Sequence, residues 1–180
     1  ELSYSTRVLD LLEQGPEARV VVHVGGAAPD RSVALAAAHR FLDESPRDVL
    51  WRVAVEHDDR IWSAREVLPL AREHGLPFVA DNLHNAVLES DPPMPLHELI
   101  REAGRTWHAL GLRPKYHLAS QARNHRAGAH ADRIHPEDAR AFLDALSHPA
   151  DLMLEAKEKE LALFALRRDC GLEGEALALR

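Results

Sequence analysis

Arg19–Glu56 reads RVVVHVGGAAPDRSVALAAAHRFLDESPRDVLWRVAVE, and this stretch decides the fold class. It opens with a run of β-branched residues, Arg19–Val24, which predicts a buried strand. Two glycines follow, and an alanine-rich segment then predicts a helix over Ser32–Glu44, with Asp30 as its N-cap. A second apolar run, Val49–Glu56, predicts another strand. The order strand, helix, strand is that of a βα unit with parallel strands.

The same alternation continues along the rest of the chain. Apolar runs at Phe78–Asp81, Lys115–Leu118 and Leu152–Glu155 predict three more strands. Five βα units in a row predict a parallel sheet covered by helices, which fits either a doubly wound sheet or a partial (β/α) barrel. Four more helices are predicted. One begins at the capping box Ser63–Glu66 and ends at Gly75, and the next follows the Pro-rich loop Asp91–Pro95 and extends to Trp107. The last two run from Pro136 to Ser147 and from Lys157 to Arg168, with Gly171 just after the final helix.

Length and composition bound the possibilities. A chain of 180 residues can bury a sizeable core, and we expect residues 1–180 to form a single domain. No apolar run approaches the roughly 18 residues of a membrane span, and no signal peptide is present. The only cysteine, Cys170, excludes an internal disulfide, fits a reducing cytoplasm and is expected to be a packing residue. Helix-like sequence from Glu1 without an initiator Met indicates a piece of a longer protein.

The charge balance is neutral on function. The formal net charge is -7, whereas a generic DNA-binding protein usually has an excess of basic residues. Bound divalent cations would offset part of this negative charge, because such ions are the largest local charges in a site. The positions of the 12 histidines therefore carry more information than the net charge does.

Side chains of the types that bind metals stand at or just after the end of every predicted strand. In a parallel barrel the carboxyl ends of the strands meet on one face, where the βα loops build the active site. Burying so many ionisable groups without partners would be costly, so shared metal ions are the simplest explanation. Imidazole together with carboxylate suits zinc, manganese or iron rather than calcium. The residues, called the ligand array below, are His23, Glu56, Asp81, His84, His117, His130 and Glu155.

Two other features accompany the ligand array. Lys115 points into the cluster if its strand alternates in phase with His117, either as a phosphate-binding cation or as a carbamate that bridges metals. The loop 121–133 contains Gln121, Arg123 and Arg126 and is either a phosphate-contacting loop or a solvated one. We expect the helical histidines to be surface or packing residues, namely His39, His74, His97, His108 and His148.

Six short runs resemble the signature blocks of the ultraviolet damage endonuclease family. Their order and spacing are similar to those of the family, and together they cover essentially the whole chain. The resemblance implies a TIM barrel related to endonuclease IV and xylose isomerase, of which this chain supplies about five βα units from the C-terminal portion. The runs are HVGG (His23–Gly26), EHDD (Glu56–Asp59), PFVADNLH (Pro77–His84), KYHLASQ (Lys115–Gln121), HAD (His130–Asp132) and DLMLEAK (Asp151–Lys157).

The resemblance also implies an activity and roles for individual residues. It implies metal-dependent incision of UV-damaged double-stranded DNA immediately 5′ to a photolesion, without a nucleotide cofactor, in the bacterial cytoplasm and away from membranes. Three divalent ions, usually Mn²⁺, are implied, and every member of the ligand array matches a family ligand. Lys115 matches a lysine that can be carboxylated, and Lys115, Glu56 and Glu155 are the implied catalytic residues. Gln121, Arg123 and Arg126 are the candidate DNA contacts.

The chain departs from the family's pattern at several positions. His57 stands in place of an Asn, Asn85 in place of a second His, Arg31 in place of a Lys and Ala119 in place of a Ser. None of these removes a proposed ligand. We expect three upstream βα units to be missing, with two histidine ligands and the loop that probes the damaged base pair. Such a barrel leaves two sheet edges and an apolar interior open, so we expect this chain alone to be unstable, inactive or both.

Three other functions remain open at this point. An abasic-site nuclease like endonuclease IV would share the metal chemistry, although the KYHLASQ and LMLEAK runs favour the photolesion enzyme. A sugar isomerase like xylose isomerase would use a similar array for one or two metals in a deep pocket. A non-catalytic fragment would be molten and poor in metal.

Overall fold

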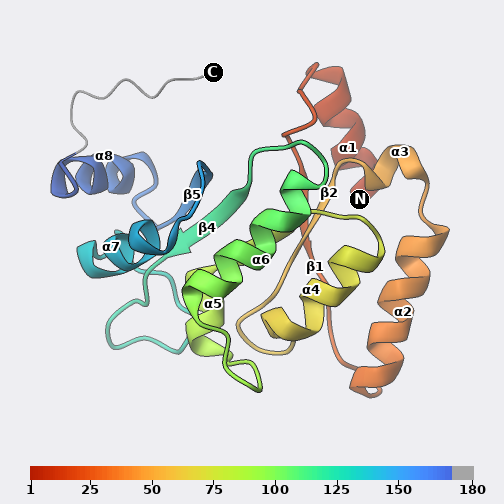
Figure 1. The fold of residues 1–180 in the computed structure, drawn as a ribbon, viewed down its shortest axis with the longest axis horizontal. Coiled ribbons are helices and arrows are strands. Elements are labelled where there is room, and N and C mark those ends of the chain that lie inside the picture. Colours follow the sequence, from red (N-terminus) through yellow and green to blue (C-terminus); the bar gives the residue numbers. More distant parts are fainter. Residues whose placement is uncertain (172–180) are drawn as a thin grey trace.

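Five parallel strands form one sheet whose spatial order follows the sequence in the computed structural model, which describes residues 1–171 (Figure 1). A doubly wound sheet reverses its strand order at a switch point. This sheet runs β1-β2-β3-β4-β5 without a reversal, and every neighbouring pair is parallel. The expected partial (β/α) barrel is therefore confirmed. The strands are β1 (Val20–His23), β2 (Val53–Glu56), β3 (Phe78–Asp81), β4 (Lys115–Ala119) and β5 (Asp151–Glu155).

Helices connect the strands and cover one face of the sheet (Figure 1). Two of the longer ones, α4 and α6, pack directly on β2 and β3. None of the helices in residues 1–171 is long and apolar enough to cross a membrane. The helices are α1 (Leu2–Leu11), α2 (Arg31–Glu44), α3 (Arg47–Leu50), α4 (Ala64–Glu73), α5 (Asn82–Val87), α6 (Leu96–His108), α7 (Pro136–Ala145) and α8 (Glu160–Asp169).

Several helix boundaries follow from local chemistry that the sequence predicts. The Asp30 carboxylate accepts a hydrogen bond from the Val33 N–H at 3.0 Å and so caps α2. Ser63 and Glu66 form the expected capping box at the start of α4. Gly75, with φ of 65°, adopts the left-handed conformation that ends this helix.

The predicted strand Val49–Glu56 is too long. Arg47–Leu50 instead forms the short helix α3, and only Val53–Glu56 pairs in the sheet. The Pro46 carbonyl accepts hydrogen bonds from the Val49 and Leu50 N–H groups at 3.0 Å, which closes this helical turn. Val49 and Leu50 are apolar because they are buried, and burial by itself does not distinguish a strand from a helix.

The last helix begins later than predicted, at Glu160 rather than Lys157. The N–H groups of Lys157 and Glu158 donate to the carbonyls of Ala131 and Asp132, at 3.1 and 3.0 Å. These bonds occupy the backbone between β5 and α8, and they also hold the loop that contains His130. A local propensity argument misses this because the partners lie more than twenty residues away along the chain.

The main core lies between the sheet and the helices. On the central strands, the side chains that point toward the helices are buried, among them Val53, Phe78 and Tyr116. On the opposite, concave face a small second cluster contains Ala54 and Val79, which lie two residues before Glu56 and Asp81 and hence on the same face as they do. Trp107 of α6 packs against this pair, so it forms a floor beneath the ligand array.

The edges of the concave face are open. Val21 on β1 shares the face of His23 and is 39% exposed, and Met153 on β5 shares the face of Glu155 and is 59% exposed. Closed barrels fill this space with side chains from all their strands. The exposure of these two residues is therefore what a barrel segment without its remaining strands should show.

Candidate metal centre

Strand register brings the ligand array together at the carboxyl ends of the strands. His23 stands opposite Glu56 in the β1–β2 pair, and Asp81 stands opposite His117 in the β3–β4 pair. Glu155 pairs with Ala119, the last residue of β4. Each βα unit thus delivers its ligand-type residue to the same end of the sheet, as expected for a parallel barrel.

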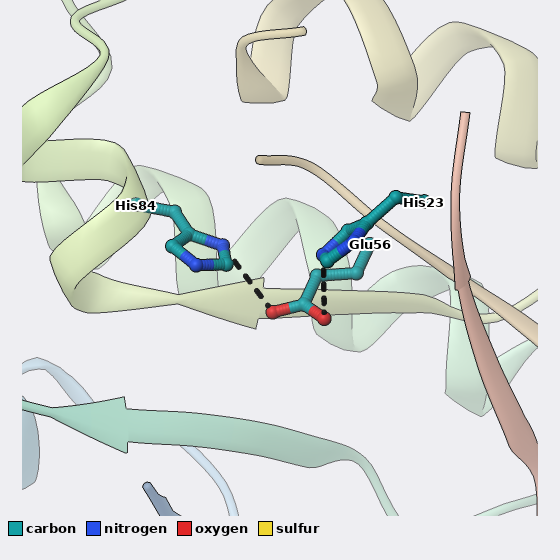
Figure 2. Close-up of side chains that lie close together, drawn as sticks. All are labelled: His23, Glu56 and His84. Carbon is teal, nitrogen blue, oxygen red and sulfur yellow. Dashed lines mark ion pairs between the residues drawn. The ribbon is translucent and has the colours of Figure 1, made fainter. Parts of the chain in front are cut away.

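Glu56 lies at the middle of the array and is in contact with three histidines. One carboxylate oxygen is 3.2 Å from His23 Nε2, while the other is 2.9 Å from His117 Nδ1 and 3.4 Å from His84 Nδ1. Figure 2 shows His23 and His84 directed at this carboxylate from two sides. Glu56 is only 3% exposed, so its charge depends on these partners rather than on water.

Asp81 has two roles at the end of β3. Its Oδ1 accepts a hydrogen bond from the His84 N–H at 2.8 Å, which caps α5 and places the His84 ring beside Glu56. Its Oδ2 is buried and has no hydrogen-bond partner among the described residues. A buried carboxylate oxygen without a partner is costly, and a cation at this point would satisfy it.

His130 and Glu155 extend the array on the other side. Glu155 Oε1 lies 3.0 Å from His117 Nδ1, and Glu155 Oε2 lies 3.5 Å from His130 Nε2. A bridge between Gln121 and His130 positions the loop that contains His130. All members of the array therefore belong to one connected group of side chains on five strands and their loops.

Two overlapping groups in this array have the geometry to hold a metal ion. One consists of His23, Glu56 and His84, and the other of Glu56, Asp81 and His117; within each group the ligand atoms lie within 4.8 Å of one another. Glu56 belongs to both groups. The mixture of imidazole and carboxylate suits Zn²⁺, Mn²⁺ or Fe²⁺. The unpartnered Asp81 oxygen is the independent observation that this donor set fits a cation.

Neighbouring charges shift the titration of these groups strongly in the metal-free protein. Burial alone would raise the pKa of Glu56, but hydrogen bonds with His117 and His23 lower it to about 2. Burial alone would lower the pKa of His117, but its contacts with Glu155 and Glu56 raise it to about 10. Burial raises the pKa of Asp81. A cluster with opposed shifts of this kind is typical of functional sites.

We predict that the metal-free protein loses stability as the pH rises from about 6.5 to about 10. The folded-state pKa of His117, about 10, exceeds its ordinary value of 6.5, so its stabilising contribution is complete below pH 6.5 and disappears toward pH 10. On the acid side, burial lowers the pKa of His57 in the folded protein to about 3, whereas its ordinary value is 6.5. As the pH falls below 6.5, His57 therefore binds a proton in the unfolded state but not in the folded state, and the protein loses stability. Asp81, with its raised pKa, contributes an opposing slope above pH 3.8.

Urea denaturation in the presence of a chelator, at a series of pH values, measures this dependence as the free energy of unfolding. The His117→Gln variant should flatten the alkaline limb, since it removes the group that titrates there. A wild-type protein equally stable at about pH 6.5 and about pH 9 would contradict the prediction.

Lys115 lies at the first position of β4, two residues before His117 and on the same face. Its Nζ donates to the Asp151 carboxylate at 2.8 Å, across the starts of β4 and β5. This ion pair lies at the end of the strand opposite Ala119. A carbamate would carry a negative charge beside Asp151 and would be repelled by it. A metal-site role for Lys115 stays a prediction, and it requires a different partner for this side chain.

The loop 121–133 is organised by Gln121 itself. Its amide nitrogen donates to the carbonyls of Ala122 and Arg126 at 3.0 and 2.9 Å, and its amide oxygen accepts from the Gly128 N–H at 2.8 Å. These bonds occupy the groups with which Gln121 would contact DNA, so the structure favours a role in shaping the loop.

The arginines of this loop differ in their availability. Arg126 lies 3.5 Å from the Asp59 carboxylate, whereas the exposed Arg123 side chain has no hydrogen-bond or ion-pair partner in residues 1–171. A hollow of about 430 Å³ adjoins the loop and is lined by cationic and acidic side chains. Its charged or titratable lining residues are Arg123, His125, Asp132, Arg133, His135, Lys157 and Glu158.

Sequence reasoning missed two residues that support the array. His57 is fully buried, and its Nε2 accepts a hydrogen bond from the Asp81 N–H at 3.1 Å. Asn82 forms two hydrogen bonds of 2.9 Å with the backbone of Ala119, which join the end of β4 to α5. The only signal in the sequence was the adjacency of each residue to a proposed ligand, and adjacency does not reveal the long-range partner.

The fold and the site define a protein of the (β/α)-barrel class with a candidate metal centre at the carboxyl ends of its strands. The model of the UV-endonuclease UvdE family matches residues 1–175, and the chain belongs to this family. A crystal structure of SacUVDE superposes with a TM-score of 0.83 at 27% identity, over 96% of this chain and 56% of that one.

Proteins named UV DNA damage endonuclease are similar to nearly the whole chain. The one from Bacillus cereus strain G9842 is 29% identical over 169 residues, and the one from Bacillus velezensis is 31% identical over 172 residues. Both alignments include 92% of this chain but only 53% and 52% of the relatives. The chain therefore spans about half the length of these relatives.

Proposed function

We propose that residues 1–180 form one domain, the C-terminal portion of a TIM-barrel endonuclease that nicks DNA immediately 5′ to UV photolesions. The observation that carries this proposal is the single connected array around Glu56, with the buried Asp81 oxygen that lacks a partner. Family membership supports the proposed substrate class, UV-damaged double-stranded DNA, which the enzyme would meet in the bacterial cytoplasm.

The proposed cofactor is a set of divalent ions, three Mn²⁺ in a complete barrel, held by the ligand array. Bound ions of this kind lower the pKa of water and stabilise charge on a phosphodiester. The chain itself would hold Glu56 and Glu155 ionised, keep Asp81 and His84 fixed at the end of β3, and orient His117 between two carboxylates. Arg123 would meet a DNA phosphate, since it is an exposed cation near His130 in the same loop.

Completion of the barrel is part of the proposal. The open concave face, with Val21 and Met153 exposed, would receive the strands that the longer relatives have in addition. We expect the 180-residue chain alone to show little incision, because the upstream βα units of the proposed barrel and its lesion-probing loop would be absent.

The test uses the complete gene product, loaded with Mn²⁺, on end-labelled duplexes that carry one photolesion, one abasic site or no damage. We expect a cut directly 5′ of the photolesion. A cut at the abasic site alone would replace the proposal with an abasic-site nuclease. If a folded, metal-loaded protein cut none of the three duplexes, the nuclease function would be overturned, and sugar isomerisation would be the next function to test.

Glu155→Gln examines the site within this test. Because Glu155 joins His117 and His130, we expect the variant to lose both bound Mn²⁺ and incision. Glu160→Gln, an exposed neighbour at the start of α8, is the matched control and should keep both. Unchanged metal content and incision in Glu155→Gln would refute the proposed role of this residue.

A further inference from the structure

A second group of metal-ligand side chains lies on the outer helical layer, away from the ligand array. His39 of α2 and His74 at the end of α4 approach to 3.0 Å between Nδ1 and Nε2, and their rings are 5.1 Å apart. Glu73 Oε2 is 3.7 Å from His39 Nδ1. From the sequence, both histidines are expected to be surface or packing residues, because they lie on helices or near helix ends.

We propose that His39, Glu73 and His74 bind a divalent transition-metal ion of the zinc type, which joins α2 to α4. This α2–α4 site is distinct from the proposed catalytic centre. Helices of a parallel β/α fold run opposite to the strands, so their carboxyl ends lie at the starts of the strands (Figure 1). The ligand array lies at the other end of the sheet.

The distances suit a small cation. Two ligand atoms at about 2.0–2.1 Å from a tetrahedral zinc ion are roughly 3.3 Å apart. The two measured separations, 3.0 and 3.7 Å, lie on either side of this value. The three ligand atoms also lie within 4.8 Å of one another. Two imidazoles with one carboxylate form a donor set that zinc uses, with a fourth position left for water.

The charges around the site also favour a cation. Asp43 Oδ1 is 3.6 Å from His74 Nδ1, which favours a proton on Nδ1 and leaves the Nε2 lone pair facing His39. Glu73 and His74 lie at the carboxyl end of α4, where the helix dipole attracts positive charge. A hollow of about 260 Å³ beside it is lined by Asp43, Glu73 and Arg47, two carboxylates and one guanidinium, so these side chains are net negative.

The two helices are already held in register at their other ends. Arg31 at the start of α2 forms an ion pair with Glu66 in the first turn of α4. An ion bound by His39 and His74 would join the two helices at a second point, more than one turn further along each of them, so it would need little rearrangement. The His74 side chain is only 8% exposed, whereas Glu73 is 68% exposed and can adjust its position to the ion.

Zinc titration with stoichiometry measured by equilibrium dialysis tests the proposal. We expect the double variant His39→Gln/His74→Gln to bind one Zn²⁺ fewer than the wild type. His97→Gln, an exposed histidine on α6, is the matched control and should bind as the wild type does. Circular dichroism of each variant verifies that it is folded.

Single substitutions of exposed residues keep the test decisive if the double variant fails to fold. Asp43→Asn should weaken this one Zn²⁺ by about 10- to 100-fold, the usual effect of losing a carboxylate behind a histidine ligand. Glu73→Gln should weaken it at least as much. A zinc-edge anomalous map of crystals should show a peak between α2 and α4.

If the wild type and the variants bound zinc with equal stoichiometry and affinity, His39 and His74 would share only a hydrogen bond and the proposal would be overturned. Anomalous peaks confined to the ligand array would overturn it as well. Mn²⁺ binding at Glu56 and DNA incision should persist in all of these variants. Failure of the α2–α4 site is thus separate from failure of the proposed nuclease function.

Discussion

Glu56→Gln is expected to abolish tight Mn²⁺ binding at the candidate metal centre, with a loss of affinity of more than about 100-fold. Glutamine keeps the shape of the side chain but removes the charge that contacts His23, His84 and His117. Both groups of the ligand array that could hold an ion contain Glu56, so one substitution affects both. The electron paramagnetic resonance signal of free Mn²⁺ measures binding without reference to catalysis.

Incision by the complete gene product should fall in parallel. Glu137→Gln is a suitable control, since Glu137 is an exposed acid in the first turn of α7 and has no contact with the array among the described ion pairs. If Glu56→Gln bound Mn²⁺ as tightly as Glu137→Gln does, the array would not be a metal centre of the proposed kind.

Trp107→Ala is expected to destabilise the chain by about 3–5 kcal/mol. The Trp107 side chain is fully buried, packs on Ala54 and Val79 beneath the ligand array, and donates a hydrogen bond to the Phe78 carbonyl at 2.8 Å. Domains are commonly stable by only about 5–15 kcal/mol. The substitution should therefore remove much of the stability and loosen the floor of the site.

Denaturant titration followed by circular dichroism measures this effect. Leu110→Ala is the matched control, because Leu110 lies just beyond the same helix and is 42% exposed. It should change the free energy of unfolding by no more than about 0.5 kcal/mol. A loss below about 1 kcal/mol for Trp107→Ala would mean that the small second cluster does not support the concave face.

The stability of the protein and its proposed function are linked at the ligand array. Glu56 is stable as a buried carboxylate only because histidines surround it, and the fully buried His57 has no partner for its Nδ1 among the described residues. Groups of this kind cost stability in a metal-free protein. Metal binding would recover that cost, so we interpret the array as retained for binding rather than for folding.

Local sequence determined the alternation of strands and helices and the residue types at the strand ends. Runs such as Val53–Glu56 and Phe78–Asp81 are apolar because both of their faces are buried. Capping at Asp30 and Ser63 depends on partners three residues away. Short-range periodicity and capping chemistry are sufficient for these features. Short-range periodicity and capping chemistry were insufficient for α3, because its buried apolar residues fit a strand as well as a helix.

Tertiary structure decided the rest, because long-range pairing is not encoded in any local window. It selected the sequential strand order of a barrel over the reversed order of a doubly wound sheet. It placed Glu56 among three histidines from three other elements, joined Lys115 to Asp151, and brought His39 to His74 across 35 positions of the sequence. Each of these contacts depends on how whole elements pack, so the residue types were evident in the sequence while their partners were not.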